Sequence, residues 1–365
     1  MRTIELFKHL IEQKSETPSD GGILDFIESY LSDFKAIRID VEDVKNLFMY
    51  KKFGEGEHLC FAGHVDVVPS GGGWDTNPYE ALERDGYIYG RGTQDMKSGV
   101  AAFVQALKEA EGFRGTLSIL LTSDEEGDAI HGTLEVLKYL KENALLPDAV
   151  IVAEPTCEEV FGDAIKVGRR GSINGYITLK GKQGHAAYPE KSINPVNLIA
   201  PRLANMAGVD LDSGDEFFAP SKFVITDIRA GMQVTNVTPN ELKMMFNVRN
   251  TTLTTQKEVR AFVEKNLEGL DYELRLTQGS YPFRTQTDTK LVRNIDASIE
   301  KVTGIKPKHS TAGGTSDARY IAPLGIDVIE FGVINDTIHA INERTSIKEV
   351  ENLCEVFKNL ITTWR

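Results

Sequence analysis

The sequence predicts an α/β fold into which a second, smaller domain is inserted, and three features support this. Apolar runs of strand length alternate with helical segments through residues 1–171. From residue 172 the order of predicted strands and helices changes, and beyond Pro282 the alternation of strands and helices returns. The length of 365 residues also exceeds what one hydrophobic core usually supports. We therefore expect a discontinuous domain, residues 1–171 and 284–365, around an insert, residues 172–283.

Composition and charge exclude several classes of protein. The formal net charge of −13 argues against nucleic acid or an anionic membrane as a partner. No apolar stretch reaches the length of a membrane span, and Glu5 lies where a signal peptide would have its apolar core. Cys60, Cys157 and Cys354 lie within or beside apolar runs without CxxC spacing. We therefore expect buried free thiols and a cytoplasmic protein.

The elements of the first domain follow from local periodicity. Helical spacing of apolar residues between Ile4 and Phe34 is interrupted by a turn-rich joint at residues 15–22, which predicts two helices. Further along, we expect strands at 36–40, 47–53, 59–63, 116–121 and 149–153, and helices at 98–109 and 132–142. This alternation of buried strands and helices is typical of a sheet that is covered on both faces.

The insert and the C-terminal segment have different patterns. In the insert we expect strands at 172–180, 222–229, 241–249 and 272–278 and helices at 195–206 and 256–267. The order β-α-β-β-α-β matches the ferredoxin-like arrangement. After the insert, the α/β pattern resumes with a helix at 291–302, a glycine-rich turn at 312–315, a strand at 327–331 and a last helix at 347–361.

Acidic and histidine residues recur where the predicted strands end. The residues at these places are His64 and Asp66, Glu125 and Glu126, Glu154, and His339, with Asp95 on a loop between them. Ligands of an open α/β sheet bind at the carboxyl ends of its strands, so these side chains are expected to share one pocket. The alternative for the first motif alone is a strand-end histidine with a helix-capping aspartate.

So many carboxylates would repel one another unless cations lay between them, which favours a bound metal pair. Imidazole and carboxylate ligands without thiolates suit zinc, or cobalt and manganese, in a catalytic site. Two metals about 3.5–4 Å apart, bridged by a carboxylate and a water, form a known hydrolytic arrangement. Asp95 is the candidate bridge because it lies between the other ligands in sequence. Of Glu125 and Glu126, one should ligate a metal while the other transfers protons.

Six motifs carry a resemblance to a known family. They are His64-Val-Asp66, Gly90 to Lys97, Ser123 to Gly127, Glu154-Pro155, Gly184-His185 and His339. Together they resemble the M20 family of dinuclear zinc amidohydrolases over essentially the whole chain. The resemblance implies a zinc-aminopeptidase-like catalytic domain with an inserted ferredoxin-like dimerisation domain. It also implies a homodimer and two Zn²⁺ per subunit, with Co²⁺ as a possible substitute.

The resemblance also implies roles for single residues. One zinc would be held by His64 and Glu154, the other by Glu126 and His339, and both by Asp95. Glu125 would be the general base, and Asp66 would orient His64. The peptide bond after Asp95 would be cis. His185 would reach the active site of the partner subunit and stabilise the oxyanion, the alternative being a surface histidine with a local partner.

Motifs at 168–173, 181–189, 236–239, 246–249 and 313–319 are most similar to particular members of the family. Those members convert N-succinyl-LL-2,6-diaminopimelate and water to succinate and LL-2,6-diaminopimelate, a step in lysine and diaminopimelate synthesis. The implied substrate contacts are Arg170, Asn236, Arg249, Gly314, Thr315 and Ser316. Arg249 has the alternative of a solvated strand-end arginine, and for Arg169 a structural role is favoured. The alternatives in function are deacetylation of N-acetylornithine, another aminoacylase or dipeptidase activity, and a non-catalytic member that binds metal or amino acids.

Overall fold

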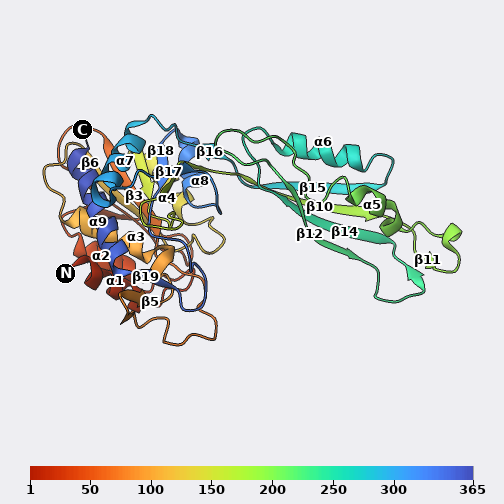
Figure 1. The fold of residues 1–365 in the computed structure, drawn as a ribbon, viewed down its shortest axis with the longest axis horizontal. Helices are drawn as coiled ribbons and strands as arrows, with labels where there is room; N and C mark the ends of the chain where they lie inside the picture. Colours follow the sequence, from red (N-terminus) through yellow and green to blue (C-terminus); the bar gives the residue numbers. More distant parts are fainter. Residues whose placement is uncertain (365) are drawn as a thin grey trace. The chain divides into compact units, whose positions relative to one another are not determined.

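The computed structural model describes residues 1–364, and the chain divides into two compact units (Figure 1). Unit 1 comprises Met1–Gly168, Arg284–Ser310 and Ser316–Arg365. Unit 2 comprises Arg169–Phe283 and Thr311–Thr315. The predicted insert began at residue 172 and did not include the turn at 311–315, which the structure places with unit 2.

Unit 1 is built on an eight-stranded mixed sheet in the order β1-β2-β6-β3-β7-β18-β8-β17. The strands are β1 (Lys35–Arg38), β2 (Asn46–Lys52), β3 (His58–His64), β6 (Thr116–Thr122), β7 (Ala149–Val152), β8 (Ala164–Lys166), β17 (Lys308–Ser310) and β18 (Asp327–Glu330). The central strands β6, β3, β7 and β18 run parallel to one another. Nearly every residue of β3, β6 and β7 is buried. Burial of both strand faces requires cover on both sides of the sheet, as the near-continuous apolar runs predicted.

The helices of unit 1 are α1 (Thr3–Glu12), α2 (Ile23–Tyr30), α3 (Ser98–Lys108), α4 (Thr133–Glu142), α7 (Lys290–Thr303), α8 (Ala318–Ile321) and α9 (Ile347–Thr363), with a 3₁₀ turn at Ala322–Leu324. Helices α1, α3, α7 and α9 pack together, whereas α4 contacts α8 and strands β2 and β6. Gly99 lets α3 approach the end of β7 closely, because a Cβ there would lie 2.3 Å from the carbonyl oxygen of Ala153. This contact fixes the backbone that leads into Glu154.

A small sheet in unit 1 was not predicted. It consists of β4 (Leu82–Arg84), β5 (Tyr87–Tyr89) and β19 (Arg344–Ser346), with β5 in the centre. Strands of three residues are too short to show a period in the sequence. The pairing of Arg344 with Tyr89 brings the segment after His339 next to the segment before Asp95. The small sheet therefore joins two parts of the chain that carry predicted metal ligands.

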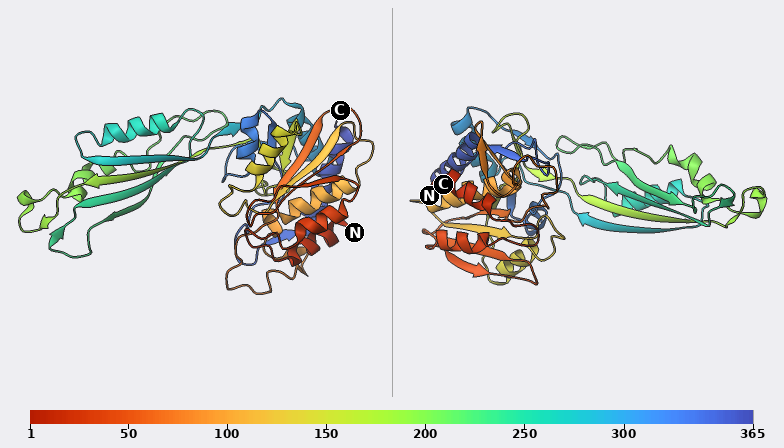
Figure 2. Two further views of the ribbon diagram at one scale, coloured as in Figure 1. Left: turned by 180° about the vertical axis from the view of Figure 1, so that it is seen from behind. Right: turned by 90° about the horizontal axis from the view of Figure 1, so that it is seen from below.

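Unit 2 has a four-stranded antiparallel sheet in the order β12-β14-β10-β15. Its main elements are β10 (Ser172–Lys180), α5 (Pro195–Leu203), β12 (Phe223–Ala230), β14 (Glu241–Val248), α6 (Gln256–Asn266) and β15 (Tyr272–Ser280), in the predicted order β-α-β-β-α-β. Shorter elements of unit 2 are β11 (Gly184–His185), a 3₁₀ turn at Pro189–Lys191 and β13 (Val237–Thr238). The two-residue strands β9 (Gly168–Arg169) and β16 (Phe283–Arg284) each contain one residue of either unit. Helix α6 runs alongside the sheet (Figure 2). Alternate residues of the strands form one core with residues of α5 and α6.

Two further predictions can be compared with the structure. Cys60, Cys157 and Cys354 are all buried and free, as predicted. Within residues 1–364, no helix is both long enough and apolar enough to cross a membrane.

Candidate metal centre

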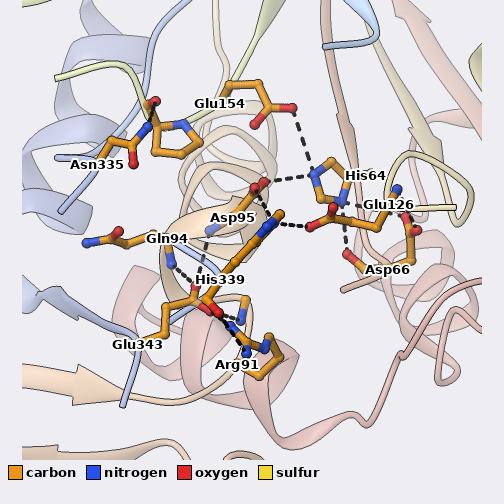
Figure 3. Close-up of polar contacts among 12 residues, drawn as sticks. His64, Asp66, Arg91, Gln94, Asp95, Glu126, Glu154, Asn335, His339 and Glu343 are labelled. Carbon is orange, nitrogen blue, oxygen red and sulfur yellow. Dashed lines mark hydrogen bonds and ion pairs between the residues drawn. The ribbon is translucent and has the colours of Figure 1, made fainter. Parts of the chain in front are cut away.

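His64 is the last residue of the buried strand β3, and both nitrogens of its ring have partners (Figure 3). Nδ1 lies 2.9 Å from the backbone oxygen of Asp66 and 3.6 Å from a carboxylate oxygen of the same residue. Because a backbone oxygen only accepts, Nδ1 carries the proton and Nε2 is left as the ligand atom. Nε2 lies 3.0 Å from Oδ1 of Asp95 and 3.8 Å from Oε1 of Glu154.

Asp95 lies in a kinked turn, Thr93–Lys97, where its own backbone is not helical, and each of its two carboxylate oxygens faces a different histidine. Oδ1 faces His64, and Oδ2 lies 3.2 Å from Nε2 of His339. The same nitrogen of His339 lies 2.8 Å from Oε1 of Glu126. His64, Asp95 and Glu126 each have one possible ligand atom in this cluster, and these three atoms lie within 4.8 Å of one another. The five predicted ligands are thus brought together in two sets around Asp95, and the peptide bond from Asp95 to Met96 is cis, as the resemblance implied.

The charges of this cluster perturb one another strongly. Burial lowers the pKa of His64, but its hydrogen bonds to Asp66 and Asp95 outweigh burial and raise this pKa well above 6.5. Hydrogen bonds to the carboxylates that face it raise the pKa of His339 to about 10. Burial, together with the charge of Asp95, raises the pKa of Glu154 well above 4.5. Without a cation, these raised pKa values favour bound protons on the histidines and on Glu154. A divalent cation could replace these protons.

Asp66 contacts more than the histidine that it was predicted to orient. Its two carboxylate oxygens accept hydrogen bonds from the backbone N–H groups of Glu125, at 3.4 Å, and Glu126, at 3.1 Å. A single buried carboxylate therefore fixes both the imidazole of His64 and the turn that carries the two glutamates. The sequence contains the three residues but gives no sign of these backbone contacts.

Glu125 lies beside the five predicted ligands, and its environment raises the pKa of its carboxyl group. Burial is the largest cause that raises its pKa well above 4.5, and the nearby carboxylates of Asp317, Asp95 and Glu126 add to it. Asp317, whose carboxylate accepts a 2.6 Å hydrogen bond from the hydroxyl of Thr133, was not among the predicted site residues. A carboxyl group with a raised pKa next to a metal site is suited to accept and return a proton.

His185 belongs to unit 2, where β11 pairs with β13. Its side chain is exposed, and its ring centroid lies 5.7 Å from that of Tyr188. Nδ1 accepts a 3.1 Å hydrogen bond from the backbone N–H of Ala187. Because Nδ1 accepts this hydrogen bond, Nε2 carries the proton of the neutral ring.

Arg170 and Arg249, two of the predicted substrate contacts, both lie in unit 2, near enough for their charges to interact. Partial burial and then the charge of Arg170 lower the pKa of Arg249. Among residues 1–364, no carboxylate lies within ion-pair distance of either guanidinium. Two neighbouring guanidinium groups without an acidic partner favour an anionic ligand. Asn236 is exposed in the same unit, and its backbone oxygen accepts a hydrogen bond from Ala186.

The predicted contacts at 314–316 differ in their environments. Gly314 is exposed, and the buried hydroxyl of Thr315 has no hydrogen-bond partner among the described residues. Ser316 is buried, and its hydroxyl donates a 2.5 Å hydrogen bond to Glu330. Arg169 donates to the backbone oxygen of Ala312 at 2.6 Å, which agrees with the structural role favoured for it.

Three buried polar residues of this region were not predicted to take part in the site. They are Arg91, Gln94 and Glu343, which surround the backbone of the Asp95 turn. Arg91 and Gln94 lie within the Gly90 to Lys97 motif, so the motif could have drawn attention to them. Nothing in the sequence distinguishes Glu343 from other acidic residues.

Comparisons with known proteins agree with this geometry. Residues 60–363 match Peptidase family M20/M25/M40. The chain is 80% identical over 365 residues, which is all of both chains, to a succinyl-diaminopimelate desuccinylase of Sulfurimonas denitrificans. In fold it is similar to the aminopeptidase PepT from Bacillus cereus, with a TM-score of 0.82 at 21% identity over 99% of this chain and 97% of that one. It is also similar to YXEP of Bacillus subtilis, a dinuclear metal-binding peptidase of the M20 family, with a TM-score of 0.74 at 14% identity over 99% and 96% of the two chains.

Proposed function

Because the chain belongs to Peptidase family M20/M25/M40, we propose that it hydrolyses N-succinyl-LL-2,6-diaminopimelate to succinate and LL-2,6-diaminopimelate, with two zinc ions per subunit. The 80% identity to a desuccinylase over the full chain supports this substrate. The observation that carries the metal site is the position of Asp95, whose two oxygens lie 3.0 Å and 3.2 Å from the Nε2 atoms of His64 and His339. The reaction belongs to lysine and diaminopimelate synthesis.

The residues present fit a pair of zinc ions. The donor atoms are imidazole nitrogens and carboxylate oxygens without a thiolate, a set that suits catalytic zinc and accepts cobalt in its place. His64 and Glu154 would hold one ion, Glu126 and His339 the other, and Asp95 both. When bound, the ions would polarise the scissile carbonyl and make the attacking water more acidic.

The protein's own residues carry the proton and bind the substrate. Water attacks the amide carbon, a C–O bond forms, and the C–N bond breaks. Glu125 accepts a proton from the attacking water and gives it to the leaving nitrogen, so that the amine departs neutral. Arg170 and Arg249 would pair with carboxylates of the substrate, and the unpartnered hydroxyl of Thr315 would donate to it.

A comparison of two substrates tests this proposal. The zinc-loaded protein should hydrolyse N-succinyl-LL-2,6-diaminopimelate with a kcat/KM about 10- to 100-fold above that for N-acetylornithine, because the acetyl group lacks a carboxylate for a charged hydrogen bond. Arg249→Met should reduce this ratio. A preference for the acetylated substrate would leave the metal mechanism in place and overturn the substrate.

A homodimer in the cytoplasm is part of the proposal. We propose that His185 of the partner subunit donates its Nε2 proton to the oxyanion, a role that the exposed ring and the acceptor bond at Nδ1 support. Three buried free cysteines are typical of proteins in a reducing compartment.

The shared site predicts complementation between two inactive variants. His185→Ala and Glu125→Gln should each be inactive alone, because each lacks one group of the site. Hybrid dimers made by mixing them should regain activity up to about a quarter of the wild type, since half the dimers are hybrids with one complete site each. Mixtures that stay inactive, with subunit exchange shown by mass spectrometry, would contradict a site shared between subunits.

A further inference from the structure

The carboxylate of Glu343 is fully buried and accepts four hydrogen bonds from one short segment (Figure 3). Oε2 accepts from Nη1 of Arg91 at 2.6 Å and from the backbone N–H of Gly92 at 3.1 Å. Oε1 accepts from the backbone N–H groups of Gln94 at 2.8 Å and Asp95 at 3.3 Å. The backbone that presents the Asp95 carboxylate is therefore held by a side chain nearly 250 residues further along the chain.

The same segment is bound to the loop that carries His339. Arg91 donates to the backbone oxygen of His339 at 3.4 Å. The side chain of Gln94 accepts a 2.8 Å hydrogen bond from the N–H of Thr337 and donates at 3.0 Å to the backbone oxygen of Arg344. Glu343, which precedes Arg344 in this loop, binds the same segment through its carboxylate. Its loop and the Asp95 turn are thus joined into one network.

His339 itself has a backbone conformation that needs such support. Its φ of +58° lies in the left-handed region, which residues other than glycine adopt only where the surrounding structure holds them. The bond from Arg91 to the carbonyl oxygen of His339 acts directly on this residue, and Glu343 in turn fixes the guanidinium of Arg91.

We propose that Glu343 is a positioning residue that sets the separation of Asp95 and His339 before any metal binds. The inference rests on the proposed metal function, because these two residues are expected to share one ion. All four groups that face Glu343 are donors, and only a carboxylate offers two acceptor oxygens to them. The negative charge also balances the buried guanidinium of Arg91, which would otherwise be unpaired.

Glu343→Gln tests the proposal because it keeps the volume and turns one acceptor into a donor. In the metal-free protein, the amides of residues 92–95 should exchange hydrogen about tenfold faster or more than in the wild type. In a titration with Co²⁺ alone, followed by its visible absorption, one of two binding steps should weaken about 10- to 100-fold. The other step should weaken less, because two of its three expected ligands, His64 at the end of β3 and Glu154 just after β7, follow buried strands and do not depend on Glu343. Glu343→Asp, which keeps the charge, should show the same changes to a smaller degree and serves if the glutamine variant does not fold.

Asp212→Asn is the matched control. The carboxylate of Asp212 also accepts four hydrogen bonds, from the backbone of Gly214 and Ser221 and the hydroxyls of Thr251 and Thr254, but all of them lie in unit 2. This variant should leave exchange at 92–95 and both Co²⁺ steps unchanged.

Two results would overturn the positioning role of Glu343. One is wild-type exchange at 92–95 in the glutamine variant, and the other is faster exchange with both Co²⁺ steps unchanged. A wild-type protein that binds no Co²⁺ would instead overturn the proposed metal function, and the exchange measurement would still decide whether Glu343 holds the Asp95 turn.

Discussion

Glu125→Gln is expected to lower kcat by about 10²- to 10⁴-fold while both metal ions stay bound, because general acid–base catalysis contributes an effect of this size. Glutamine keeps the volume of the side chain but cannot take the proton of the attacking water. None of the ligand-to-ligand contacts around Asp95 involves the Glu125 side chain. The measurement is kcat in steady state, with metal content determined by elemental analysis of the same sample.

Glu126→Gln provides the control, since the two glutamates are adjacent and only Glu126 contacts His339, at 2.8 Å. The Glu126 variant should lose metal ions together with activity, whereas the Glu125 variant should lose activity alone. Near-normal turnover in Glu125→Gln would remove this residue as the base. Equal metal loss in both variants would show that the two glutamates do not have separate roles.

Removal of the metals is the second change with a large expected effect. A chelator should abolish hydrolysis, and Zn²⁺ or Co²⁺ should restore it, because a divalent cation both polarises the scissile carbonyl and makes the attacking water more acidic, which the hydrogen bond proposed for His185 cannot do. The metal-free protein should stay folded, because the metal centre lies at the carboxyl ends of the central strands, and the hydrophobic core around these strands contains none of the metal ligands. Circular dichroism of the stripped protein checks this before zinc is added back.

Much of the fold could be predicted because its signals are local. Strands β3, β6 and β7 are mainly apolar and almost wholly buried, and buried parallel strands show this pattern. The short strands β8 and β17 were not predicted, because three residues show neither a period nor a long apolar run. The sheet of β4, β5 and β19 was not predicted for the same reason, although it joins two segments that carry expected metal ligands.

The candidate site could also be predicted only in part, because some of its contacts depend on residues far apart in the sequence. His64, Glu154 and His339 could be found because ligands gather at the carboxyl ends of strands, and the family resemblance assigned them to two sets. The network of Glu343 could not be found, because its partners Arg91 and Gln94 lie about 250 residues away in the chain. The contacts of Asp66 with the amides of Glu125 and Glu126 likewise depend on tertiary structure alone.

The central claim is that this protein uses a metal pair at Asp95 to cleave a succinyl amide. The measurement that tests it most directly is the hydrolysis of N-succinyl-LL-2,6-diaminopimelate by the stripped protein, before and after zinc is added back. We expect no turnover without metal and full turnover once zinc is restored, with zinc located by anomalous scattering at His64, Glu154, Glu126, His339 and Asp95. Turnover that persists in protein shown by elemental analysis to be free of metal would contradict it.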